Sequence, residues 1–153
     1  MSSVSVKITG AKELQKKFVK LSVYANKKKP LYKRISIQLL NEISKTFKEE
    51  THEEKPWGEL SKATKKARRK GKGKNKEPKI LQDTGHLRRS FVGDATSQLA
   101  RVGTVIKYSE YHEDGTEKIP QRKMLPSDER AMEIAVETTD KYIDNQIKKL
   151  RLK

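Results

Sequence analysis

Residues 31–47 read LYKRISIQLLNEISKTF, and apolar side chains recur in this stretch every four positions. Because an α-helix has 3.6 residues per turn, side chains at this spacing share one face. The face drifts slowly around the helix, which suits packing across a second helix. The stretch therefore predicts a long amphipathic helix that organises the core. Its buried face would consist of Leu31, Ile35, Leu39, Ile43 and Phe47, with Leu40 beside them.

Two shorter elements are expected before this helix. Residues 4–8 alternate apolar and polar side chains, which is typical of a short strand with one buried face. Pro30 separates the long helix from an earlier one, because the residue before a proline is pushed out of the α region. The earlier helix is predicted from apolar residues spaced four, three and four apart, at Leu14, Phe18, Leu21 and Ala25.

Beyond residue 80, short elements alternate with turns. Residues 87–91 form a short element of undetermined type, and residues 99–106 predict a strand with a kink at Gly103. Residues 119–125 predict another strand or an extended loop. Ser127 can cap a long C-terminal helix, which Asp128 and Glu129 favour at its positive end. The apolar stripe of that helix would consist of Ile134, Thr138, Tyr142 or Ile143, Ile147 and Leu150.

Together these elements predict an α+β fold. Two N-terminal helices and the long C-terminal helix would pack on a small antiparallel sheet built from residues 4–8, 86–106 and 119–125. A length of 153 residues fits one domain, residues 1–153. Only 33% of the residues are apolar and 37% are charged, so the core is small. A small core with long helices gains by sharing apolar surface, which favours a homo-oligomer.

Bulk properties narrow the class of protein further. Cysteine is absent, which excludes disulfides and thiolate metal sites and is compatible with a reducing cytoplasm. The N-terminus lacks the basic and apolar regions of a secretory signal, and no run approaches the roughly 20 apolar residues of a membrane span. We therefore expect a soluble protein that does not enter membranes.

A net charge of +16 attracts polyanions, and the excess is concentrated in residues 62–79. This segment holds ten Lys and Arg residues against one acid, Glu77. It is expected to be a flexible, disordered basic loop, preceded by a short helix over residues 59–69. The segment is either simply solvated or binds a polyanion, and without aromatic side chains DNA contact would be nonspecific. The candidate contacts are Lys65, Lys66, Arg68, Arg69, Lys70, Lys72, Lys74 and Lys76.

Catalytic and cofactor chemistry has little support in the sequence. His52, His86 and His112 match no zinc-binding pattern, and the carboxylate pairs are explained as solvated helix ends. Asp83 and His86 could in principle activate Ser90, but no nucleophile-elbow context surrounds that serine. The glycines at 71 and 73 lack the spacing of a phosphate loop. We therefore predict a non-enzymatic protein without metal or cofactor.

Five short boxes occur in order between residues 56 and 126. They are Pro56-Trp57-x-x-Leu60-x-x-x-Thr64, Ile80-Leu81-x-Asp83-Thr84-Gly85-x-Leu87-x-x-Ser90, Val102-Gly103-Thr104, Tyr108-x-x-Tyr111-His112-x-x-Gly115 and Ile119-Pro120-x-Arg122-x-x-Leu125-Pro126. This ordered set resembles the phage virion morphogenesis family, the Mu-like tail-completion and head–tail joining proteins. Lys123-Met124 stands where Pro-Phe is common in that family. The residues that carry the resemblance are Trp57, Leu60, Leu81, Thr84, Gly85, Leu87, Gly103, Tyr108, His112, Gly115 and Arg122.

The boxes also have a physical interpretation of their own. Trp57, the only tryptophan, is expected to anchor a loop on the core. Gly85, Gly103 and Gly115 are expected to adopt backbone conformations that other residues resist. Tyr108 and His112 lie four residues apart and are expected to pack together. These are roles in a scaffold.

The resemblance implies a structural subunit of a tailed phage or prophage that joins head to tail or completes the tail. Its partners would be other tail or head–tail connector proteins and further copies of itself in a ring, with nonspecific contact to packaged DNA. It would act at the head–tail region of the virion and in the host cytoplasm during assembly. The alternative from the charge alone is a free-standing nonspecific duplex DNA-binding protein.

Overall fold

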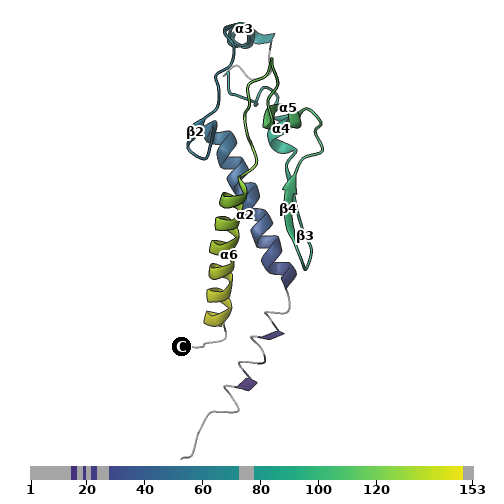
Figure 1. The fold of residues 1–153 in the computed structure, drawn as a ribbon, viewed down its shortest axis with the longest axis vertical. Coiled ribbons are helices and arrows are strands. Elements are labelled where there is room, and N and C mark those ends of the chain that lie inside the picture. Colours follow the sequence, from purple (N-terminus) through teal and green to yellow (C-terminus); the bar gives the residue numbers. More distant parts are fainter. Residues whose placement is uncertain (1–14, 17–18, 20–21, 24–27, 73–77, 150–153) are drawn as a thin grey trace, which may run out of the picture.

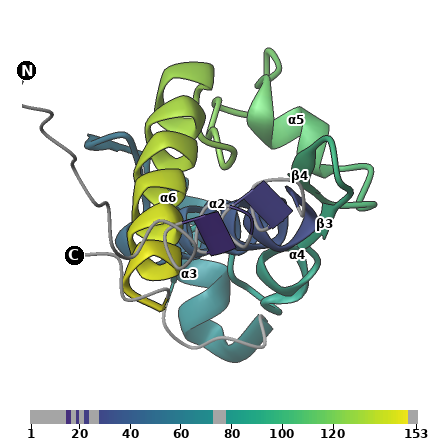
Figure 2. The same ribbon diagram turned by 90° about the horizontal axis from the view of Figure 1, so that it is seen from below.

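The computed structural model describes residues 15–16, 19, 22–23, 28–72 and 78–149. Helix α2 (Lys28–Glu49) lies between helix α6 (Asp128–Lys149) on one side and a β-hairpin on the other (Figures 1 and 2). Helices α2 and α6 run antiparallel along the long axis (Figure 1). The architecture is mixed helix and strand, as predicted. The strand expected at residues 4–8 and most of the first helix lie outside the described residues.

The repeating stretch at residues 31–47 does form the central helix. The buried face of α2 contains Ile35, Leu39, Ile43 and Phe47, and Phe47 is 0% exposed. The prediction that the residue before Pro30 leaves the α region is wrong, because the helix begins at Lys28 and includes Lys29. Pro30 is tolerated in the first turn, since its missing N–H has no helical partner there. The periodicity thus predicted the helix and its face correctly.

Helix α6 begins where the sequence predicted. The Ser127 hydroxyl accepts a hydrogen bond from the Arg130 N–H at 3.1 Å and so caps the helix. The Arg130 guanidinium also donates to Glu42 of α2 at 3.1 and 3.3 Å, which ties the two helices together, and the carboxylates of Glu42 and Glu133 raise its pKa. Of the alternatives Tyr142 and Ile143, the structure buries Tyr142. The predicted stripe needs a correction at Ile147, which is half-buried beside the buried Gln146. The buried residues follow a spacing of four, at Ile134, Thr138, Tyr142 and Gln146, whereas Ile143 is exposed.

The sheet is a hairpin within the predicted range of residues 86–106. Strands β3 (Val92–Ala95) and β4 (Ala100–Gly103) pair antiparallel, with Val92 opposite Gly103 and Ala95 opposite Ala100. Gly93 permits the hairpin to approach α2 closely, because an added Cβ would lie 3.0 Å from the Leu40 side chain. Residues 87–91, whose type was left open, fall mostly in the single helical turn α4 (His86–Arg89).

The segments downstream and upstream of this hairpin differ in part from the predicted sheet. Residues 119–125 form an extended loop, which was one of the two alternatives, and not a strand of the sheet. Pro120 has no N–H, and the N–H groups of Arg122 and Met124 bond to His112 and Glu113 rather than to a neighbouring strand. Strands β1 (Thr51–His52) and β2 (Lys55–Pro56) form a small hairpin that periodicity did not predict. Glu53 and Glu54 occupy its turn with φ of 48° and 68°, instead of ending a helix.

The core has two parts. Near the N-terminal half of α2, Ile35 and Leu39 pack against Ile134 of α6. The larger part lies at the other end of α2, where Phe47 meets Trp57 and Phe91 edge-on at ring distances of 5.5 and 5.8 Å. This part contains Ile43, Phe47, Trp57, Ile80, Leu87 and Met124. Within the described ranges, no helix is long and apolar enough to cross a membrane.

Candidate interaction site

The first and last boxes of the sequence are joined by side-chain hydrogen bonds. The buried Arg122 guanidinium donates to the carbonyl oxygen of Gly58 from Nε at 2.9 Å and from Nη2 at 2.8 Å. Its Nη2 also donates to the Glu59 carbonyl at 3.1 Å. The Trp57 indole N–H donates to the Lys123 carbonyl at 2.9 Å, so Trp57 does anchor its loop on the core. These bonds hold together segments more than 60 residues apart in the chain.

The fourth box, which contains helix α5 (Ser109–Glu113), is attached to the same segment. The Arg122 N–H donates to the His112 carbonyl at 2.6 Å. The Glu113 carboxylate accepts from the N–H groups of Met124 and Leu125 at 2.8 and 3.4 Å. Gly115 has φ of +78°, and a Cβ there would lie 3.0 Å from a backbone nitrogen. Sequence reasoning missed Glu113, whose position in the fourth box was the available signal.

The second and third boxes complete the arrangement. Gly85 has φ of +68° at the start of α4, as expected of this glycine, and Leu87 is buried. The hydroxyls of Ser90 and Thr104 lie 2.6 Å apart, which links the two boxes. Gly103 does not follow the prediction, because its φ is not positive and an added Cβ would meet nothing within 4 Å.

Residues of four boxes line a cavity of about 210 Å³ at this junction. The rings of Tyr108 and His112 pack edge-on at 6.4 Å, as expected. Burial and the nearby Arg122 charge lower the pKa of His112, and burial also lowers the pKa of Arg122. The cavity is lined by Leu60, Arg68, Leu81, Asp83, Thr84, Leu87, Tyr108, His112 and Arg122. Met124 is 1% exposed and fills the adjacent core.

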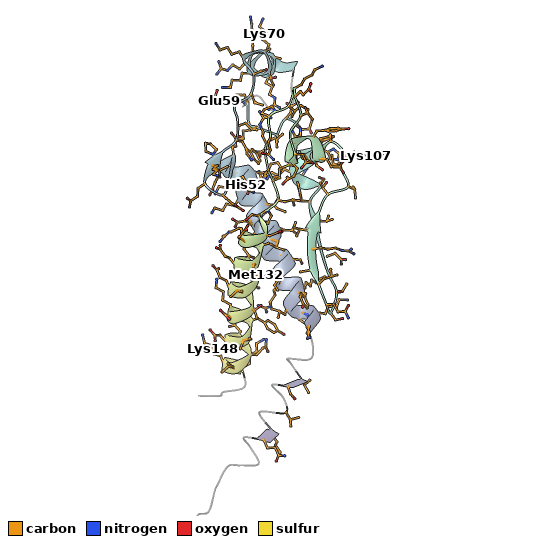
Figure 3. The ribbon with its side chains drawn as sticks, viewed as in Figure 1. His52, Glu59, Lys70, Lys107, Met132 and Lys148 are labelled. Atoms are coloured by element: carbon orange, nitrogen blue, oxygen red, sulfur yellow. The ribbon has the colours of Figure 1, made fainter. Side chains whose placement is uncertain are left out.

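A helical tip rich in lysine and arginine lies above this junction (Figures 1 and 3). This basic tip consists of α3 (Lys62–Ala67) and the π-helical η1 (Arg68–Lys72). The Ser61 hydroxyl caps α3 by accepting the Thr64 N–H at 3.1 Å. Residues 62–72 of the predicted basic loop are therefore helical, in line with the short helix predicted over residues 59–69. The flexibility predicted for residues 62–79 stays a prediction.

The candidate polyanion contacts fall into two groups. Lys65 donates to Glu59 at 2.7 Å, and Arg68 binds the Lys79 carbonyl and lies 3.6 Å from Asp83, so both attach the tip to the body. The second group consists of Lys66, Arg69 and Lys70, which are exposed and form no ion pair with the described residues. Lys62, which was not among the predicted contacts, has the same properties. The side chain of Lys72 is not described, and Lys74 and Lys76 lie outside the described residues.

The catalytic alternative has no geometric support among the described residues. No hydrogen bond or ion pair there joins Asp83, His86 and Ser90. Instead, the Ser90 hydroxyl donates to the Leu87 carbonyl at 2.7 Å, as a structural serine would. No group of three or more His, Asp or Glu side chains that could hold a metal ion occurs in the described ranges.

Comparisons with known proteins agree with the boxes. No curated protein and no solved structure matches the chain. The sequence model of one family, described as the phage virion morphogenesis family, matches residues 9–143. This match covers most of the chain and all five boxes. Membership implies a structural role in phage assembly and contact with other virion proteins. The chain belongs to the phage virion morphogenesis family.

Proposed function

We propose that this chain is a non-enzymatic head–tail joining or tail-completion subunit that works as a ring. The observation that carries the proposal is the convergence of the five family boxes on one junction. Their hydrogen bonds hold loops together, and among the described residues none of these bonds forms part of a catalytic arrangement. A scaffold of this kind suits a subunit that presents a fixed surface to its neighbours.

The basic tip gives this surface an exposed positive charge. Four described cations, Lys62, Lys66, Arg69 and Lys70, are exposed and unpaired within the described ranges, while Lys65 and Arg68 fasten the tip. A short cationic helix can lie along a phosphate backbone or against an acidic protein ring. The described tip contains no aromatic side chain to stack on bases, so contact with DNA would be independent of its sequence.

Disruption of the gene in its phage tests the joining role directly. We expect full heads and finished tails that stay separate in electron micrographs, and complementation by the intact gene should restore joined particles. Normal infectious particles without the protein would refute the proposed role.

A charge variant tests the tip separately. Lys66→Gln, Arg69→Gln and Lys70→Gln together should reduce the yield of joined particles, because they remove free cations and spare both tip anchors. The matched control carries the same loss of charge at exposed lysines elsewhere, with Lys107→Gln, Lys118→Gln and Lys148→Gln. An equal reduction in the yield of joined particles by the two variants would show that total charge, and not the tip, matters. An undiminished yield from the tip variant would refute the role of the tip.

A free-standing nonspecific DNA-binding protein is the second candidate, and the exposed cations of the tip favour it. Binding of purified protein to duplex DNA across a salt series distinguishes the two. Tight binding with a steep salt dependence, together with normal particles after gene disruption, would support this candidate. Weak binding with separated heads and tails would support the joining role.

A further inference from the structure

Helix α6 has a second apolar stripe on the side that faces away from α2. Met132, Val136 and Ile143 are 66%, 53% and 46% exposed, and Thr139 lies between them. Their spacings of four, three and four place them on one helical face, roughly opposite the buried Ile134. This is the pattern of one side of a two-stranded coiled coil. No described part of the chain covers it.

Acidic side chains line one edge of this stripe. Glu129, Asp140 and Asp144 are exposed, fall on the same flank at helical spacing, and form no ion pair within the described ranges. Glu133 and Glu137 lie on the same side, paired with Arg130 and Lys141 of α6 itself. An apolar stripe with an acidic edge fits a basic amphipathic helix.

The chain contains one segment with these properties. Leu14, Phe18, Leu21 and Ala25 repeat the same spacing of four, three and four. Residues 11–25 hold four lysines against one glutamate, Glu13. The described positions in this segment, residues 15–16, 19 and 22–23, are all helical. In Figure 1 they lie beyond the N-terminal end of α2 and not along α6.

We propose that the outer face of α6 binds residues 11–25 of a second copy of the chain. The contact is a short two-helix coiled coil, with lysines of the segment beside the acidic edge of α6. Each copy then offers a donor segment at one place and an acceptor face at another. Such a heterologous contact generates rings when its rotation closes. The inference thus names the subunit contact of the proposed ring and rests on that proposed function.

Cross-linking tests the contact well, because the natural chain has no cysteine. A Thr139→Cys chain is mixed with a differently tagged Lys17→Cys chain, and a short bismaleimide is added. Both positions lie near the middle of their stripes, so they stay close whether the helices run parallel or antiparallel. We expect a mixed dimer in excess of that from a control pair in which Lys118→Cys replaces Thr139→Cys.

A further substitution shows whether the stripe causes the cross-link. Val136→Lys in the Thr139→Cys chain should lower the yield of mixed dimer and weaken self-association at least about tenfold, because it removes an apolar contact. Val136 is exposed, so the fold should survive, and circular dichroism checks this. Asp140→Lys should weaken the contact too, and Lys17→Glu on the other chain should restore part of it in sedimentation experiments.

The outcomes separate this inference from the function. No excess of mixed dimer over the control, or an excess unaffected by Val136→Lys, overturns the contact. Preferential cross-linking within a chain that carries both cysteines also overturns it, because the chain's own segment would then cover α6. These measurements use purified protein. A failed cross-link with separated heads and tails in the phage would refute the contact and leave the joining role standing.

Discussion

Arg122→Met is the sharpest test of how the boxes hold the molecule together. The substitution keeps an unbranched stem and removes the guanidinium, which is 6% exposed as part of its residue. The carbonyls of Gly58 and Glu59 then lose donors at 2.8–3.1 Å in a site that water reaches poorly. The loop that carries Trp57 loses one of its two attachments to the Arg122 segment.

The expected loss in the free energy of unfolding of Arg122→Met follows from these contacts. A hydrogen bond to a charged group contributes about 1.5–3 kcal/mol, and two carbonyls are involved. Part of this is offset, because the variant no longer buries a charge. The free energy of unfolding should therefore fall by roughly 2–4 kcal/mol. With a urea dependence of about 2 kcal/mol/M, the middle of the usual range for small proteins, the unfolding midpoint should fall by about 1–2 M.

Urea unfolding followed by circular dichroism measures this change. Arg122→Lys should lie between the wild type and Arg122→Met, because one ammonium group cannot reproduce the planar fork of the guanidinium. Arg101→Met is the matched control, since its ion pair with Asp94 is exposed and should contribute little. A midpoint of Arg122→Met equal to that of Arg101→Met would refute the reasoning.

Three further predictions concern single positions. Gly115→Ala should lower the free energy of unfolding by more than about 1 kcal/mol, because Gly115 has a φ of +78° and a close backbone neighbour. Gly103→Ala should have little effect, and urea unfolding of the two variants measures the difference. Ser127→Ala should cost about 1 kcal/mol through loss of the α6 cap, measured in the same way. Because the pKa of His112 is lowered in the folded protein, the unfolded chain protonates this imidazole at a higher pH than the folded chain does. The contribution of His112 to the free energy of unfolding is therefore full above about pH 6.5 and is lost as the pH falls below that value. His112→Gln should remove this part of the pH dependence of the urea midpoint, and an unchanged pH profile would contradict it.

The family boxes were visible in the sequence, but their contacts were not. Trp57 and Gly115 were chosen correctly, because a lone tryptophan and a glycine between turn residues have local signatures. Arg122 was selected only for its place in a motif. Its role depends on carbonyl groups 63 and 64 residues earlier, and no local pattern encodes that pairing.

The basic segment shows the same division. Its charge was evident in the composition, whereas the separation of Lys65 and Arg68 from the free cations of the tip depends on Glu59 and Asp83. Neither acid stands at a helical spacing that would have marked it as a partner. Likewise, the hairpin turn at Glu53 and Glu54 has φ values that glutamate seldom adopts, so its residue types did not predict it.

By itself, the sequence determined the two long helices, the Ser127 cap, the hairpin region and membership in the family. Helices and caps depend on contacts between residues three or four apart, which periodicity records directly. Only the tertiary structure decided between Tyr142 and Ile143, and buried Gln146 more deeply than its neighbour Ile147, because the contact with α2 sets the buried face. It alone also brought Trp57, His112 and Arg122 to one junction, since hydrogen bonds between distant loops leave no period in the chain.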